Sequence, residues 1–369
     1  MTIHKRNILK EFAMIFTVIA TLIVCSCTKD KAKEQIHDNQ PKEICFKATT
    51  TTRGANIESS NLYEIYVTAF ASRLDIENAE SLNDIYYTLY FTNVPYREIS
   101  GYFHSDPAYY WPQDTRLMTF AAYAPSPKEL GAEIEWFVAD DEHEDAGLFM
   151  EGFSPKADIQ EQVDFVYGAS ITRYDYTNGG LELKMDHKLS RILLMGHENN
   201  PDYNFNIMGF RIAEVYGTAD LGSGADWINL RNKTAYSYTY DTPLELHSTR
   251  ALLARSDIGN AFLIPQNLTA WNPTEDPSNK AKGAYIAILV QITDTAGNQF
   301  FPETPGEYEW VAIPFSTEWD DGYSYTYILD FTSGAGYTTP DSANPGQLVL
   351  NNNVYISRSV KNWTEDNIK

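Results

Sequence analysis

The sequence predicts an all-β fold built from β-sandwiches. Short runs of β-branched and aromatic residues recur along the chain, and turn residues separate them. Aromatic residues make up 14% of the sequence and include 25 tyrosines, a composition typical of strands. Long amphipathic helices are scarce. Because 369 residues exceed one ordinary sandwich, the pattern indicates two strand-rich domains in series.

The N-terminal residues have the character of an export signal, which we assign to residues 1–26. Basic residues precede Phe12–Val24, an apolar run of 13 residues that is short for a membrane span and suitable for a signal peptide. Cys27 follows Ser26, with Val24 three positions before it, an arrangement that resembles a bacterial lipobox. We therefore expect lipid on Cys27. An uncleaved anchor or an ordinary secretory signal would explain the same run.

Residues 27–43 are polar and charged, and we interpret them as a flexible tether. The predicted N-terminal domain covers residues 44–196. Its first strand begins at Ile44, and alternation places Ile44, Phe46 and Ala48 on one face. The next predicted strands, each bounded by turn residues, are Leu62–Phe70, Asp84–Phe91, Leu117–Ala124, Val163–Ser170 and a run from Leu181 onward.

Local signals connect these strands. Thr177–Gly180, before the alternating Leu181, Leu183 and Met185, is typical of a hairpin turn. Short helical turns are expected in Asp106–Pro112 and Ser126–Trp136.

The predicted C-terminal domain covers residues 197–369, and the boundary lies near Gly196–Tyr203. A second hairpin is expected at Asp294–Phe301, where a turn sequence joins two strand-like runs. The expected strands are Tyr203–Gly217, Lys233–Tyr240, Ala261–Gln266, Ala284–Thr293, Tyr323–Thr332 and Asn353–Val360.

The net charge of −22 argues against a nucleic-acid partner, because phosphate contacts need clustered Lys and Arg. The motifs of common hydrolases, metalloproteases and nucleotide-binding enzymes do not occur, so we predict no catalytic residues, no metal ligands and no cofactor. The acidic run Asp140–Gly147 lacks EF-hand spacing and favours a solvated loop over a Ca²⁺ site. His187 is expected to form a structural hydrogen bond, and Cys45 to pack as a small apolar residue.

Several blocks occur in a fixed order after the lipobox and its tether. They are the strand ending in "TTR", "YYWPQDTRLMTFAAYAP", "VDFVYGAS" with "LELKMDHKLSRILL", "FLIPQNLT", "IPFSTEWDDGYSYTYILDF" and the terminal "VYISRSVKNWTED". Together, from Ile44 to Trp363, they resemble the fimbrillin family, the type V pilins of Bacteroidia. The resemblance implies two transthyretin-like β-sandwich domains and a structural subunit of a cell-surface fimbria that contributes to adhesion.

The resemblance also implies a processing route. Family precursors reach the outer membrane as lipoproteins, and a trypsin-like protease cuts after an Arg that follows the first strand. Here that position matches Arg53, with Gly54 as the new N-terminus, so the strand carrying Ile44, Phe46 and Ala48 would be displaced. A strand from another fimbrial subunit would fill the opened groove. The C-terminal run offers Val354, Ile356 and Val360 as a donor face, although it could equally complete its own domain.

Two further expectations remain open. Asp294-Thr295-Ala296 and Asp341-Ser342-Ala343 resemble the O-glycosylation signal of Bacteroidia, with Thr295 and Ser342 as acceptors. The alternative to a polymerising subunit is a surface lipoprotein adhesin that keeps its lipid on Cys27 and binds glycan or host protein.

Overall fold

A computed structural model gives the structure of the chain, and it confirms the predicted all-β class. It describes residues 41–50, 62–72, 87–112, 118–137, 147–172, 180–222, 225–254 and 260–362. Almost all of these residues belong to one compact unit, Glu43–Lys369. Within them the strands greatly outweigh the helical segments, which are the short helix α2 (Pro127–Leu130) and the 3₁₀ turn η3 (Ile159–Glu161).

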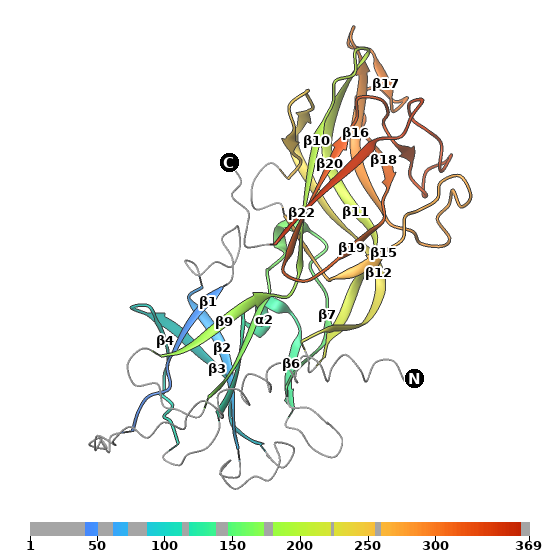
Figure 1. Cartoon of the computed structure of the whole chain (residues 1–369). Coiled ribbons are helices and arrows are strands. Elements are labelled where there is room, and N and C mark those ends of the chain that lie inside the picture. The colour runs from blue at the N-terminus through green and yellow to red at the C-terminus, as the bar shows by residue number, and fades with distance from the viewer. Residues whose placement is uncertain are drawn as a thin grey trace, which may run out of the picture. The chain divides into compact units, whose positions relative to one another are not determined.

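The first set of strands closes into a barrel (Figure 1). Around the barrel, each hydrogen-bonded to the next, lie β1 (Phe46–Thr50), β4 (Tyr102–Ser105), β3 (Tyr87–Ile99), β2 (Glu64–Ser72), β5 (Met118–Ala124), β8 (Val166–Thr172) and β9 (Leu181–His187). The ring is completed because β1 also pairs with β9. The sequence predicted a sandwich here, and strand β1 is the element that turns the open sheet into a closed one.

Alternating side chains build the barrel core. In β9, Leu181, Leu183 and Met185 are buried while the residues between them are exposed, as the period of two requires. They join a continuous cluster of buried residues that includes Ile44, Phe46, Ile65, Val67, Phe91, Tyr96, Phe103, Trp111 and Phe120. Trp111 of this cluster is buried.

The second set of strands forms a sandwich of two main sheets. One sheet has the order β13 (Ala251–Leu252), β10 (Ser190–His197), β20 (Tyr323–Asp330), β22 (Tyr355–Asn362), with β14 (Ala261–Leu263) also on β10. The other has the order β21 (Tyr337–Thr338), β18 (Glu309–Pro314), β16 (Tyr285–Asp294), β11 (Tyr203–Leu221), β7 (Gly147–Phe153), β6 (Glu133–Phe137), with β12 (Trp227–Glu245) on β11 and β17 (Gln299–Phe301) on β16. A small pair consists of β15 (Gln266–Leu268) and β19 (Thr317–Trp319).

The two main sheets share one core. Buried residues from β10 and β20, such as Leu194 and Tyr327, belong to the same cluster as Ile207 of β11 and Ile288 of β16. Face-to-face packing of two sheets through interdigitating apolar side chains is the sandwich arrangement that the strand spacing predicted.

The chain passes from the barrel to the sandwich at Lys188–Ser190. His187 ends β9, and Ser190 begins β10, which pairs with β20 in parallel. Strand β7, which precedes this point in sequence, nevertheless pairs with β11. Asp220 of β11 strengthens that junction, because its Oδ1 accepts a hydrogen bond from the Gly152 backbone N–H at 2.8 Å.

Local signals in the sequence account for several elements. The capping box of Ser126 and Glu129 and the left-handed Gly131 delimit α2, so the predicted helical turn in Ser126–Trp136 is confirmed, although Glu133–Phe137 forms β6. The turn expected in Asp106–Pro112 is wrong, since this stretch is not helical. The antiparallel β16–β17 pair confirms the hairpin predicted at Asp294–Phe301, and β8 pairs antiparallel with β9 as the other predicted hairpin requires.

Candidate functional site

The candidate site is the first strand, β1, together with the space it fills. We call this space the β1 slot and define it as the gap between β4 and β9 that β1 occupies. Strand β1 runs parallel to β9 over its 5 residues, from Phe46 opposite Leu181 to Thr50 opposite Met185. It runs antiparallel to β4, where Phe46 lies opposite Phe103. Figure 1 shows β1 in blue beside β9 and β4. Removing β1 would therefore open the barrel along two strand edges.

The inward face of β1 carries most of its packing. Ile44 and Phe46 are both 0% exposed, Ala48 is half-buried against the same core, and Thr50 is buried. The Phe46 ring meets Tyr96 edge-on with centroids 4.9 Å apart, and Phe120 at 5.2 Å. The one-face arrangement expected for Ile44, Phe46 and Ala48 is present in the structure. Displacement of this strand stays a prediction.

The outward face of β1 faces solvent. Lys47 is exposed, while Cys45 is only partly covered. Burial, followed by the nearby charge of Glu43, raises the pKa of the Cys45 thiol. The thiol is therefore a poor nucleophile at neutral pH, since the thiolate is the reactive form.

Polar contacts hold the beginning of the strand. The Ile44 N–H donates to the Tyr109 carbonyl at 2.8 Å, and the Leu181 N–H donates to the Cys45 carbonyl at 2.9 Å. Glu43 Oε1 lies 2.9 Å from His104 Nδ1 on β4. These contacts fix the register of β1 from its first residues onward.

Gly180 makes the close approach of β9 to β1 possible. Its φ is +69°, a left-handed conformation that favours glycine, and a Cβ there would lie 3.1 Å from the carbonyl carbon of Phe46. Gly180, the last residue of the "TNGG" block, therefore leaves room for β1 directly before β9 begins. Thr177–Gly179 lie outside the described residues.

The predicted cleavage position lies just beyond β1. Arg53 and Gly54 belong to residues 51–61, which are outside the described part of the chain, as is Cys27. Arg97, another arginine of the N-terminal strands, lies within β3, where it pairs in register with Glu64 and His104. A protease needs a backbone that is free to enter its active site. Because Arg97 is paired with strands on both sides, it is a poor substrate in the folded chain.

The predicted donor residues lie in or beside β22. Val354 is buried in the sandwich core and Ile356 packs against it, whereas Val360 is 42% exposed. Strand β22 pairs with β20 along its whole length, from Tyr355 opposite Asp330 to Asn362 opposite Tyr323. In the single chain this run therefore completes its own sheet, and its role as a donor stays a prediction.

One side chain attaches β22 to the strands beneath it. Arg358 Nη1 donates to Thr317 Oγ1 at 2.7 Å, and the same oxygen accepts from Tyr327 Oη at 2.7 Å. Trp319 Nε1 in turn donates to Tyr327 Oη at 2.9 Å. A hollow of about 290 Å³ beside these groups is lined in part by Phe315, Ile356 and Arg358.

The predicted glycosylation positions differ in accessibility. Thr295 is exposed in the turn between β16 and β17, where Asp294 Oδ1 accepts hydrogen bonds from the Ala296 and Asn298 N–H groups. The Asp of this triplet thus has a structural role in the turn. Ser342 Oγ, by contrast, is buried. Glycosylation at either position stays a prediction.

Sequence reasoning expected His187 to be structural, and the structure gives it a partner that was not foreseen. His187 Nδ1 lies 2.7 Å from Asp164 Oδ2, and both side chains are 0% exposed. Next to it Lys188 forms an ion pair with Asp321, and the Lys188 carbonyl accepts from Trp227 Nε1. The "HKLS" block therefore joins the barrel to the sandwich. Because His187 and Asp164 lie 23 positions apart, no local pattern indicates their pairing.

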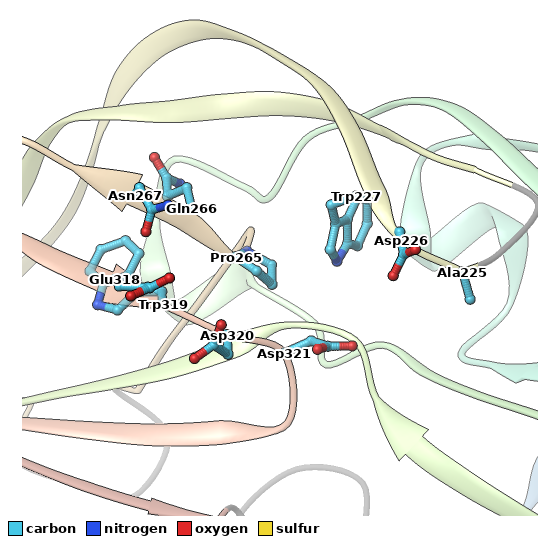
Figure 2. A pocket seen from close by; sticks show the side chains of 10 residues that line it. All are labelled: Ala225, Asp226, Trp227, Pro265, Gln266, Asn267, Glu318, Trp319, Asp320 and Asp321. Atoms are coloured by element: carbon cyan, nitrogen blue, oxygen red, sulfur yellow. The ribbon is translucent and has the colours of Figure 1, made fainter. Parts of the chain in front are cut away.

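Figure 2 shows an acidic hollow of about 260 Å³. Asp226 and Trp227 lie on one side of Pro265, and Glu318 and Trp319 on the other. Trp319 is only 2% exposed, so its ring offers no platform for a sugar. Among the described residues, no group of His, Cys, Asp and Glu side chains has the arrangement of a metal site. In the same residues no helix is long and apolar enough to cross a membrane.

Comparison with known proteins identifies the family. The fimbrillin-like family model matches residues 47–363. A fimbrial protein from Bacteroides vulgatus is similar in structure, with a TM-score of 0.54 and 14% identity, covering 87% of this chain and 99% of that one. A candidate cell adhesion protein from Bacteroides ovatus has a TM-score of 0.45 and 13% identity, with coverages of 89% and 100%. The tip fimbrial protein Mfa3 from Porphyromonas gingivalis has a TM-score of 0.36 and 9% identity, with coverages of 88% and 100%. A search of curated proteins finds no significant relative. The match to the family model, over most of its length, shows that this chain belongs to the fimbrillin-like family.

Proposed function

We propose that the chain is a subunit of a cell-surface fimbria that is assembled by strand exchange after proteolytic removal of β1. The family supports a fimbrial or adhesion subunit at the cell surface, a structural rather than a catalytic role. The observation that carries the finer proposal is the place of β1 in the barrel. A short strand near the start of the fold closes the barrel, and an arginine suited to a trypsin-like protease follows it by 3 positions, at Arg53.

The energetics of β1 suit a removable element. Burial of Ile44 and Phe46 contributes roughly 1.5–3 kcal/mol each, which is enough to hold the precursor closed. Each backbone hydrogen bond adds about 1 kcal/mol net. Removing the strand would leave an apolar slot between β4 and β9 with two open edges. Such edges recruit another strand, because backbone groups and apolar pockets both need partners.

The remaining parts of the chain fit export to the cell surface. Residues 1–26 would direct export, and lipid on Cys27 would hold the precursor at the outer membrane through the tether of residues 27–43. Cleavage after Arg53 would release the subunit from that anchor and open the β1 slot in one step. Other fimbrial subunits and the processing protease are therefore the expected partners.

The test is limited digestion of the purified precursor with a trypsin-like protease, followed by sequencing of the new N-terminus. We expect a product that begins at Gly54 with the remaining fold intact. The matched control Arg53→Ala should stay uncut at this position under the same conditions. A folded precursor that resists cleavage at Arg53, or a cleaved one that keeps β1 through prolonged competition with other strands, would overturn the proposal.

A further inference from the structure

We propose that the β1 slot takes its replacement strand from a different subunit and rejects the C-terminal strand of a second copy of this chain. The inference rests on the proposed function, because it concerns the strand that replaces β1. Strand β1 itself shows what the slot accepts. The segment Ile44–Thr50, which contains β1, has four inward positions: Ile44, Phe46, Ala48 and Thr50, which are aliphatic, aromatic, small and small polar in that order.

The second inward position requires an aromatic ring. Phe46 is fully buried, and its ring fills the space between Tyr96 and Phe120 at centroid distances of 4.9 and 5.2 Å. Both contacts are edge-to-face, a geometry that an aliphatic side chain cannot reproduce. A smaller side chain would leave part of the space empty, and empty space in a packed core weakens binding.

The third inward position requires a small, uncharged side chain. Ala48 packs half-buried against the barrel core and lies opposite Leu183 in the register of β9. The buried side chains that flank the slot belong to Leu181, Leu183 and Met185 of β9 and to Phe103 and Ser105 of β4. None of these five carries a carboxylate. Because the position is half-buried, a cation here would lose part of its water without gaining an opposite charge from these side chains, which is unfavourable.

The C-terminal strand could turn either of its two faces toward the barrel core, and neither face meets these requirements. With Val354 in the position of Ile44, Ile356 replaces the aromatic Phe46 and Arg358 replaces Ala48. The guanidinium of Arg358 stays charged at any physiological pH, so the third position would hold an uncompensated cation. This facing fails at two of the four positions.

The other facing fails at the first position. With Tyr355 in the position of Phe46, Ser357 and Ser359 match Ala48 and Thr50 well. Asn353 then takes the place of Ile44, which is 0% exposed. An amide side chain buried there would need hydrogen-bond partners in a position that Ile44 fills with apolar contacts alone.

Strand β22 is also well held in its own sandwich. It pairs with β20 along its length, and Arg358 donates to Thr317 at 2.7 Å in a chain of hydrogen bonds that continues to Tyr327 and Trp319. Arg358, which does not fit the β1 slot, is therefore also a residue that holds β22 in its own sandwich. The occupant is therefore a strand of another polypeptide with the inward pattern aliphatic, aromatic, small, and Thr or Ser, running parallel to β9 as β1 does.

The experiment uses the processed protein, cut after Arg53, and three labelled peptides whose binding is followed by fluorescence anisotropy. The first peptide has the sequence of residues 44–52. The second has the sequence of residues 353–362. The third is the second peptide with Ile356→Phe and Arg358→Ala, which restores the aromatic and small positions while keeping length and most of the composition. The processed protein alone is also analysed by size-exclusion chromatography.

We expect the first and third peptides to bind and the second to bind at least ~100-fold more weakly than the third, because the second peptide puts a cation at a half-buried position without a carboxylate partner and lacks the aromatic contact. The processed protein alone should remain monomeric. Binding of the second peptide as tightly as the third, or self-assembly of the processed protein, would overturn this inference while leaving strand exchange intact. Failure of the first peptide to bind would instead refute the open slot, and the proposed function with it.

Discussion

Replacing Phe46 by alanine tests the structural importance of β1 in the precursor. Phe46 is 0% exposed and contacts Tyr96 and Phe120 edge-on. Truncation of a buried phenylalanine to alanine costs about 3–5 kcal/mol, because apolar burial is lost and a cavity remains. The loss in the free energy of unfolding has an upper limit for this strand. If β1 detaches while the rest stays folded, the loss cannot exceed what the strand contributes, and burial of Ile44 and Phe46 contributes roughly 3–6 kcal/mol together.

The assay combines equilibrium denaturation of the full precursor with hydrogen exchange of the β1 amides. Denaturation reports the free energy of unfolding, and exchange reports local opening of β1. The matched control is Lys47→Ala, which changes the neighbouring, exposed residue on the same strand and should stay within about 0.5 kcal/mol of the wild type. We expect Phe46→Ala to accelerate exchange throughout residues 46–50. The reasoning is refuted if both variants behave alike, or if exchange in β1 is unchanged by Phe46→Ala.

Three other predictions follow from the same structure. Hydrogen bonds from Arg231 lower the pKa of Asp220 to about 2; burial partly offsets this effect, and hydrogen bonds from Gly152 and Asn229 add to it. The ionised Asp220 carboxylate therefore contributes its full stabilisation above the unfolded pKa near 3.8. That contribution is lost as the pH falls toward 2. Because Arg231 is partly exposed, we expect Asp220→Asn to cost about 1–2 kcal/mol at pH 7 and less than half of that at pH 2.5, measured by denaturation at both pH values. Gly180→Ala should destabilise the precursor by more than the control Gly297→Ala, since both glycines have positive φ but only Gly180 lies against β1. Equal losses in the free energy of unfolding, measured by denaturation, would contradict the close approach of Gly180 to β1. If the protein is O-glycosylated, peptide mass spectrometry should place the sugar on the exposed Thr295, and a fully occupied Ser342 in the folded protein would contradict the burial of its hydroxyl.

Local patterns predict individual strands well and their partners poorly. The alternation of Ile44, Phe46 and Ala48 was sufficient to predict the buried face of β1, since the period of a strand is a local property. The partner of β1 is β9, more than 130 positions later, and the pairing is parallel. Nothing in the first strand specifies such a partner, because register depends on packing across the whole barrel.

The full lengths of two strands could not be predicted from the sequence, for specific reasons. Strand β12 extends over Trp227–Glu245, although only Lys233–Tyr240 has a clear strand pattern. Asn229 and Asn232 adopt positive φ, and the β11–β12 register shifts nearby, so the alternation is interrupted within one continuous strand. Strand β3 contains Pro95, which ordinarily argues against a strand interior.

At the candidate site, too, local sequence patterns predicted the strand, and long-range packing could not be predicted. The predicted cleavage position came from the sequence between two strands and from the family resemblance. The burial of Ile44 and Phe46 gives a physical reason why, under the proposed function, β1 would have to be cut before another strand could replace it. The preference of the slot for a foreign strand could not be predicted from sequence. It depends on Tyr96 and Phe120 around Phe46, and on the hydrogen bond from Arg358 to Thr317, which only the folded chain brings together.

The most direct test of strand exchange is the N-terminal residue of the protein isolated from the cell surface. Proteolytic release of β1 predicts that the assembled protein begins at Gly54 and carries no lipid. A mature protein that begins at a lipidated Cys27 and retains β1 would contradict the account. The chain would then be a permanently anchored surface adhesin, in which Ile44 and Phe46 close the barrel for good.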